Sequence, residues 1–159
     1  WRRLASLRVM GGGVHVAGDG VDASLRWAFD LHAGLRLAVP SRRSGMYWLF
    51  GGDVGVSFTP RGNETPALWL GGLSVGAGNI WLSLAWSPRL VFGSLSEGTA
   101  LGLRNTLSVC AFLGLTCLDV SHQYLSVEGR DQHDIRVAFG IDVGMLAQLL
   151  VQFADARPG

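Results

Sequence analysis

The sequence predicts an all-β fold, an antiparallel up-and-down transmembrane β-barrel of about eight to ten strands that forms one domain over residues 1–159. Three observations support this prediction. Apolar and small or polar residues alternate along most of the chain, turn-forming residues separate the alternating runs, and charge is sparse. Of the 159 residues, 48% are hydrophobic, 16% are charged and 23 are glycine, and the formal net charge is +1.

The composition excludes several classes of protein. The chain is too apolar to be intrinsically disordered, and its charge is too balanced for general nucleic-acid binding. Its length suits one domain with a substantial core. All 13 basic residues are arginine, with no lysine.

The first alternating run covers residues 21–39, in which every odd position is apolar, including Leu25, Trp27 and Phe29. A helix would scatter these side chains around its circumference, whereas a strand places them on one face. The run is either one long strand or a hairpin that turns near residues 30–33.

Six further runs follow, each with its phase reset after a turn. They cover residues 48–58, 67–77, 80–92, 101–113, 118–124 and 135–145, and residues 147–153 could add another strand. The segments between them are rich in Gly, Pro, Asn, Asp and Ser, which favour turns. These segments are residues 18–20, 41–45, 60–65, 77–79, 94–99 and 129–134.

The two faces of the runs indicate which solvent each one meets. The face opposite the apolar one carries Gly, Ser, Thr, Ala and isolated Arg or Asp, rather than the Lys and Glu of an open soluble surface. The apolar face carries aromatic residues such as Trp48 and Trp69 near strand ends, which is typical of membrane interfaces. Strands of this length can cross a bilayer, and closure into a barrel satisfies their backbone groups.

Two other architectures are compatible with parts of the pattern. Residues 66–88 carry no formal charge and are long enough for a membrane helix, but four glycines and the turn-like Ala77-Gly78-Asn79 interrupt them. A soluble barrel with its apolar face inward and its charged face in water also alternates. The membrane barrel accounts for more of the chain.

In outline the chain resembles the small bacterial outer-membrane β-barrel proteins. The resemblance rests on alternating, aromatic-flanked segments, namely residues 25–39, 69–77, 80–92 and 135–143, and extends as a pattern over about 90% of the chain. It implies a location in the bacterial outer membrane and contact with membrane lipid. It includes no specific signature motif and therefore implies no particular activity.

Nine charged residues fall on the polar face and would share one barrel interior. Because an interior of about eight strands is filled by side chains, buried charges there must be paired and hydrogen-bonded. We expect a structural ion-pair network that plugs the barrel, and the alternative is a polar path or a small-anion site. The nine residues are Arg26, Asp30, Arg36, Asp53, Arg89, Arg104, Asp119, Arg136 and Asp142.

Histidine and cysteine offer a few candidate sites. Alternation places His122 on the opposite face from Ser121 and Asp119, which argues against a hydrolytic triad. His15 and His32 have no partner that the sequence identifies. Residues 131–134 (Asp-Gln-His-Asp) contain potential metal ligands, but a solvated loop is the stronger interpretation, so no metal or cofactor is expected.

The two cysteines, Cys110 and Cys117, either form a disulfide that closes a hairpin or remain buried thiols. A disulfide would indicate an oxidising compartment.

The favoured function is that of a non-enzymatic outer-membrane barrel with a plugged polar interior and a structural or interaction role through its loops. A narrow pore is a variant of this function. The expected partners are membrane lipid and a protein that contacts the loops or the barrel wall, with no nucleic acid. The alternatives are a soluble barrel that binds an apolar ligand and a lipid-modifying membrane enzyme.

Overall fold

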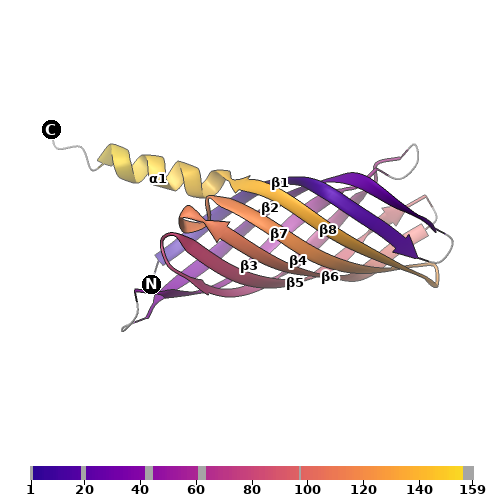
Figure 1. The fold of residues 1–159 in the computed structure, drawn as a ribbon, viewed down its shortest axis with the longest axis horizontal. Helices are drawn as coiled ribbons and strands as arrows, with labels where there is room; N and C mark the ends of the chain where they lie inside the picture. Colours follow the sequence, from indigo (N-terminus) through magenta and orange to yellow (C-terminus); the bar gives the residue numbers. More distant parts are fainter. Residues whose placement is uncertain (1, 19–20, 42–44, 61–63, 97, 156–159) are drawn as a thin grey trace.

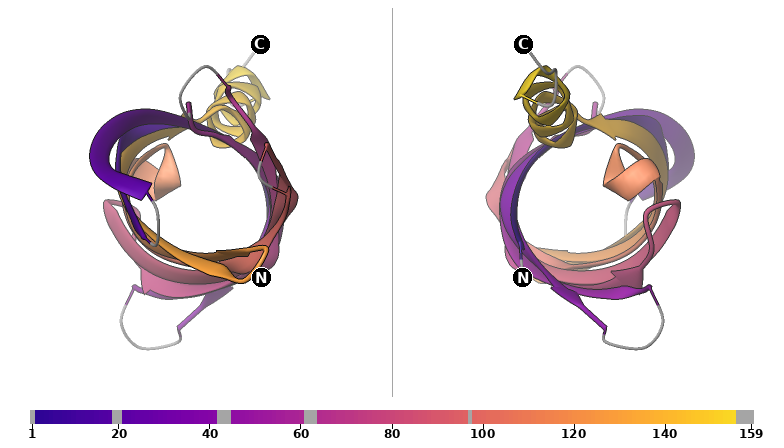
Figure 2. Two further views of the ribbon diagram at one scale, coloured as in Figure 1. Left: turned by 90° about the vertical axis from the view of Figure 1, so that its right-hand side faces the viewer. Right: turned by 90° about the vertical axis from the view of Figure 1, so that its left-hand side faces the viewer.

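Eight antiparallel strands form one closed barrel in chain order in the computed structural model, which describes all residues except 1, 19–20, 42–44, 61–63, 97 and 156–159. The predicted all-β barrel is confirmed, with a strand number at the lower end of the predicted range (Figures 1 and 2). The strands are β1 (Arg2–Gly18), β2 (Val21–Pro40), β3 (Tyr47–Phe58), β4 (Ala67–Gly78), β5 (Leu82–Leu95), β6 (Gly98–Ala111), β7 (Thr116–Val127) and β8 (Arg130–Asp142).

The barrel has two distinct ends. At the end that we call the hairpin end, connections join β1 to β2, β3 to β4, β5 to β6 and β7 to β8; the longest of these comprises residues 59–66. At the opposite end, the helix end, helix α1 (Val143–Asp155) follows β8, and the short 3-10 helix η1 (Phe112–Gly114) joins β6 to β7 (Figure 1). Pairing of β1 with β8 closes the barrel.

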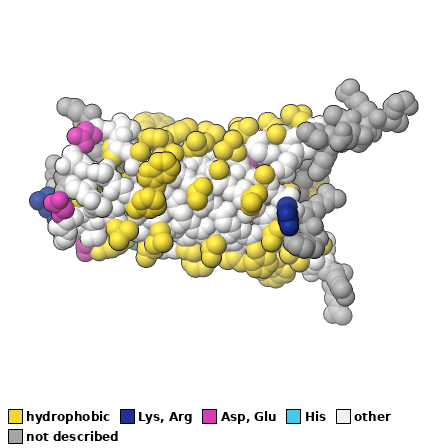
Figure 3. Space-filling model, turned by 180° about the vertical axis from the view of Figure 1, so that it is seen from behind, with side chains coloured by type: hydrophobic (Ala, Val, Ile, Leu, Met, Phe, Trp, Pro, Cys, Tyr) yellow, Lys and Arg dark blue, Asp and Glu magenta, His cyan; other side chains and the backbone are white. Residues whose placement is uncertain are grey.

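The outer wall is apolar. Side chains at the predicted outward positions are exposed, among them Trp27 (78%), Leu84 (52%) and Phe139 (58%). Figure 3 shows hydrophobic side chains around the middle of the barrel, with the charged side chains near its ends. A continuous exposed apolar surface of this extent suits lipid rather than water.

This exposure decides between the membrane barrel and the soluble barrel. A soluble barrel would bury the tryptophans and expose the arginines. Here Trp48 is 54% exposed and Trp86 is 50% exposed, whereas Arg104 is 1% exposed. The chain therefore has the inverted arrangement of a transmembrane β-barrel.

The structure resolves one open alternative and corrects two details of the predicted strand pattern. Residues 21–39 form one long strand, so there is no hairpin near residues 30–33. β1 did not stand out in the sequence because Val14 and Val16 point inward while Gly11 and Gly13 point outward, which obscures the alternation. Residues 143–145, which appeared to continue the last strand, belong to α1.

Residues 147–153, expected as a further strand, also lie in helix α1. The barrel is already closed at Asp142, so no sheet edge remains for another strand, and the good helix formers that follow adopt a helix instead. The Asp142 side chain caps this helix by accepting a hydrogen bond from the Met145 amide at 3.0 Å. Within the described residues, no helix is both long enough and apolar enough to cross a membrane.

Glycine is required where the small barrel bends sharply. A Cβ atom at Gly12 would lie 2.0 Å from the Val137 carbonyl oxygen, and one at Gly102 would lie 1.9 Å from that of Tyr124. Both positions lie on the inward-facing register, where strong coiling brings a neighbouring backbone into the space of a side chain. These contacts account for part of the high glycine content.

We predict that Leu103→Arg lowers the free energy of unfolding by about 2–4 kcal/mol, because it places a cation on the lipid face at the middle of β6. Ile80→Arg, at an exposed site in the turn between β4 and β5, should cost at most about 1 kcal/mol. Urea unfolding in lipid vesicles, followed by tryptophan fluorescence, measures both. Equal losses would contradict the assignment of the exposed apolar side chains around the middle of the barrel, the apolar belt, to the lipid-facing surface.

Candidate functional site

The centre of the barrel interior is organised around Asp30 on β2. One carboxylate oxygen of Asp30 lies 2.9 Å from Nη1 of Arg104, and the other lies 3.4 Å from Nη1 of Arg136. The Ser57 hydroxyl accepts hydrogen bonds from both guanidinium groups, at 3.0 Å from Arg104 Nη2 and 2.7 Å from Arg136 Nη1. Four strands thus meet at one carboxylate and one hydroxyl.

A second layer of contacts links this centre to the hairpin end. Arg104 Nε donates to the Gln123 amide oxygen at 2.7 Å, and the Gln123 amide nitrogen donates to Asp134 at 3.0 Å. Asp134 also lies 3.6 Å from Nη2 of Arg136. The prediction that Asp134 lies in a solvated turn is wrong. β8 begins at Arg130 and directs Asp134 into the interior, where it is 0% exposed.

A second ion pair joins β5 to β3. Arg89 donates through Nε and Nη2 to the two oxygens of Asp53, with a shortest separation of 2.6 Å. Its third nitrogen, Nη1, donates to the Thr106 hydroxyl at 2.9 Å. This two-point contact is the geometry for which the planar guanidinium is suited.

A third group of charges lies toward the helix end. Arg8 approaches Asp142 at 3.6 Å and Asp119 at 4.0 Å. Asp142 also accepts hydrogen bonds from the Ser6 hydroxyl and from the Leu7 amide. Asp142 therefore connects the interior charges, the β1–β8 seam and the start of α1.

The other two arginines on the predicted polar face have different surroundings. Arg36 packs over Gly51, where an added Cβ would lie 2.9 Å from the Arg36 Cγ, and it is within electrostatic reach of Asp142 and Asp53. Arg26 lies at the hairpin end, where its described partners are the Ser24 hydroxyl and the Pro60 carbonyl oxygen. The structure thus separates Arg26 from the central contacts.

Cys110 and Cys117 are disulfide-bonded and lie directly opposite each other on β6 and β7, with Cα atoms 4.1 Å apart. Both are buried, at 2% and 1% exposure, and they pack with Met10 inside the barrel. The disulfide joins β6 to β7 at the helix end, next to the 3-10 helix η1 that connects these two strands.

Toward the hairpin end, an apolar cluster fills part of the interior. Its members are inward-facing residues of β4 to β7, all at most 4% exposed: Leu68, Leu70, Val91, Ala100, Leu125 and Val127. Because β4 carries Leu68 and Leu70 inward and Trp69 outward, both of its faces are apolar there, which explains the mixed pattern of this segment in the sequence.

Sequence analysis missed several residues of the interior. It did not select Arg8, since β1 showed no clear alternation, and it found no partner for His32. His32 is 4% exposed, and a Cβ at Gly55 would lie 2.5 Å from its ring. The continued alternation from Arg26 through Asp30 was the signal that His32 also faces inward.

The side chains that the sequence offered as a catalytic triad or a metal site lie on opposite sides of the barrel wall. His122 is exposed on the outer surface, whereas Ser121 and Asp119 are buried inside. In residues 131–134, Asp131 and His133 face outward while Gln132 and Asp134 face inward, so their side chains cannot converge on one ion. Within the described parts of the chain, no group of three or more potential ligands could hold a metal ion.

The arrangement can hold the wall rigidly from inside. The carboxylates Asp30, Asp53, Asp119, Asp134 and Asp142 stand beside the arginines Arg8, Arg36, Arg89, Arg104 and Arg136 in balanced number. Among the described residues these opposite charges balance, so this set requires no counter-ion.

Known proteins similar to this chain occur among solved structures. No protein-family model matches the chain, and no curated protein matches it. Two solved structures of Ail, the attachment invasion locus protein of Yersinia pestis, are similar, one of them in complex with the heparin analogue sucrose octasulfate. They are 14% and 13% identical to the chain, cover 89% of it and 99% of their own chain, and have TM-scores of 0.40.

We predict that Asp30→Asn lowers the free energy of unfolding by about 3–5 kcal/mol, because it leaves Arg104 and Arg136 facing a neutral amide in the interior. The change keeps the side-chain volume, so cavity formation does not contribute. Glu64→Gln, at an exposed site, should change the value by no more than about 0.5 kcal/mol. A loss for Asp30→Asn as small as that of the control would show that the network does not stabilise the fold.

We also predict that the disulfide resists reductant in the folded barrel, because both sulfurs face the packed interior. Replacing both cysteines by alanine should lower the free energy of unfolding by about 2–3 kcal/mol, the chain-entropy value for so short a loop. Resistance to reductant is tested by adding reductant to the folded and to the unfolded protein and measuring the alkylation of the released thiols. Rapid alkylation of the folded protein would contradict it.

Proposed function

We propose that the chain acts as a non-enzymatic outer-membrane β-barrel whose interior is sealed, with a structural or interaction role rather than solute transport. The observation that carries this proposal is the filled interior. Side chains of all eight strands occupy it, and the largest of them, including Arg8, Arg104 and Arg136, are at most 2% exposed.

Two barriers in series support the sealed interior. The arginine–aspartate contacts span the centre, and the apolar cluster around Leu70 and Leu125 fills part of the hairpin end. An ion that passed would have to separate buried charge pairs and then cross an apolar layer, each of which is unfavourable. A narrow pore is the less favoured variant of the proposed function, because both barriers would have to open.

The outer-membrane location is supported by two features of different kinds. The exposed apolar belt matches the lipid face of bacterial outer-membrane barrels. The disulfide between Cys110 and Cys117 fits an oxidising compartment such as the bacterial periplasm.

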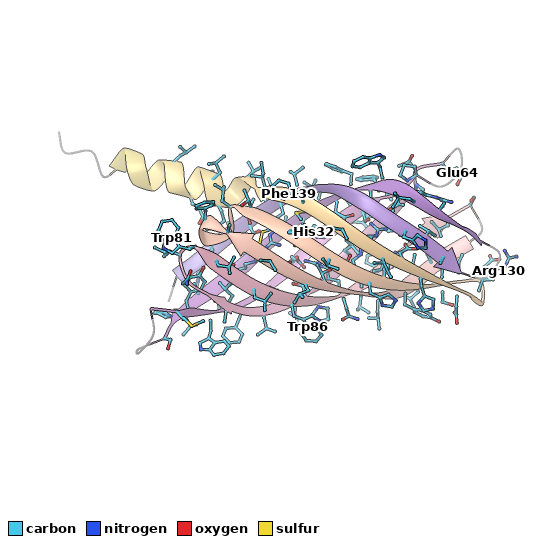
Figure 4. All side chains as sticks on the ribbon, viewed as in Figure 1. His32, Glu64, Trp81, Trp86, Arg130 and Phe139 are labelled. Atoms are coloured by element: carbon cyan, nitrogen blue, oxygen red, sulfur yellow. A yellow bond between two sulfur atoms is a disulfide. The ribbon has the colours of Figure 1, made fainter. Side chains whose placement is uncertain are left out.

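An interaction role would use the connections at the hairpin end. Three of these connections comprise two residues each, and residues 59–66 form the longest of the four. Figure 4 shows the exposed Glu64 and Arg130 at this end. The exposed Glu128 lies in the connection between β7 and β8. A protein partner would therefore meet short, mixed-charge hairpin tips, or else the apolar wall within the bilayer.

The absence of enzymatic activity is part of this proposal. The lipid-modifying alternative requires a nucleophile, a base and a carboxylate within hydrogen-bond reach. The only sequence candidate for that set has His122 outside the barrel and Ser121 inside it, which favours the non-enzymatic role.

Conductance of the purified protein in planar lipid bilayers tests the sealed interior. The wild-type chain should insert without discrete current steps, while a general porin in the same bilayer gives them. The triple variant Leu68→Ala, Leu70→Ala, Leu125→Ala should remain silent if the arginine contacts also block the path. Reproducible steps from the wild-type chain would overturn the sealed-barrel function.

Fractionation of expressing bacteria tests the location. The folded chain should sediment with the outer membrane and migrate faster on a gel before boiling than after it. Recovery in the soluble fraction without detergent would contradict the proposal.

A further inference from the structure

Three of the four histidines lie together on the outer wall at the hairpin end. The register pairs His15 of β1 and His122 of β7 with the same residue, Ile135 of β8, and His133 lies two positions along β8 from it. All three histidines are exposed. Sequence spacing gave no sign of this grouping, because the residues come from three separate strands that meet only when the barrel closes.

Two of these histidines are in direct contact. Nδ1 of His133 lies 3.4 Å from Nε2 of His122, and their rings are nearly parallel, with centroids 5.5 Å apart. The ring of Tyr124 lies against His133 at 5.2 Å, and the Tyr124 hydroxyl donates a hydrogen bond to Asp131. Tyr124 therefore packs against the His133 ring, and Asp131 holds the Tyr124 hydroxyl.

We propose that His122 and His133 form a binding site for a divalent transition-metal ion of the zinc type on the outer wall. Two imidazole nitrogens bound to one tetrahedral zinc at about 2.0–2.1 Å are about 3.3–3.4 Å apart. The observed separation of 3.4 Å therefore matches without movement of the strands. In the proposed site, small side-chain rotations that keep this separation turn both lone pairs toward one ion, and water completes the coordination.

The position of the pair also suits such a site. Ile135 and Val137, on the same face of β8, are 56% and 50% exposed and belong to the apolar belt, while Asp131 on the other side of His133 belongs to the polar rim. The pair therefore stands at the border of the belt, where water can supply ligands. A bound ion would join β7 to β8, the last hairpin of the barrel.

Binding should stabilise the folded barrel, because the two nitrogens are held together only in the folded state. Cu²⁺ should bind more tightly than Zn²⁺, following the general order for nitrogen ligands. Mg²⁺ prefers oxygen ligands and should not bind.

The test uses the full chain without a histidine tag, refolded in detergent and titrated with Zn²⁺, Cu²⁺ and Mg²⁺ by calorimetry. One Zn²⁺ should bind per chain, and His122→Ala and His133→Ala should each weaken it at least tenfold. His15→Ala is the matched control, since it removes a histidine of the same face that is not part of the pair, and it should change the affinity less than twofold.

A thermal unfolding series gives an independent measurement. Zn²⁺ should raise the unfolding midpoint of the wild-type chain and of His15→Ala, but not that of the two pair variants. The gel shift on boiling verifies that every variant is folded. Absence of Zn²⁺ binding by the folded wild-type chain, or equal loss of affinity in His15→Ala and the pair variants, would overturn the proposed site.

Discussion

The burial of arginine inside an eight-stranded barrel is the constraint on which the rest of the structure depends. Four guanidinium groups that are at most 2% exposed cannot remain unpaired away from water. Each of them therefore has a carboxylate within 4.0 Å. Because these partners come from other strands, the charge pairs also fix which strands lie across from one another. A barrel with the same outer wall but an apolar interior would lack these pairwise contacts between strands on opposite sides of the barrel.

The apolar wall and the charged interior are two consequences of one inversion. Lipid surrounds the barrel, so the side chains that a soluble protein buries are exposed, and the charges gather where water is excluded by packing. Asp142 lies at the end of β8, where the barrel wall gives way to helix α1. It pairs with Arg8 inside, accepts a hydrogen bond from the Leu7 amide at the seam, and caps the first helical residues after the barrel. One carboxylate therefore joins strand closure to the change from strand to helix.

Much of this fold could be predicted from sequence, because period-two alternation reports the two faces of a strand directly. The assignments failed where the alternation was weak or where another effect prevailed. β1 carries valines inward and glycines outward, so its two faces look alike. α1 continues the apolar composition of β8, and only the closure of the barrel shows that no strand can follow. The partners of Arg104 lie on three other strands, and separations of 19 to 74 residues carry no local signal.

The use of arginine without lysine has a geometric reason inside the barrel. Arg104 donates from three nitrogens to three residues, namely Gln123, Asp30 and Ser57, which belong to β7, β2 and β3. Arg89 contacts both oxygens of Asp53 and the Thr106 hydroxyl in the same manner. A lysine ammonium is a compact point charge at the end of a flexible stem, and it cannot span partners that lie on opposite sides of a planar fork. The interior network therefore depends on the shape of the guanidinium as well as on its charge, and an equal number of lysines would neutralise the aspartates without making these multiple contacts.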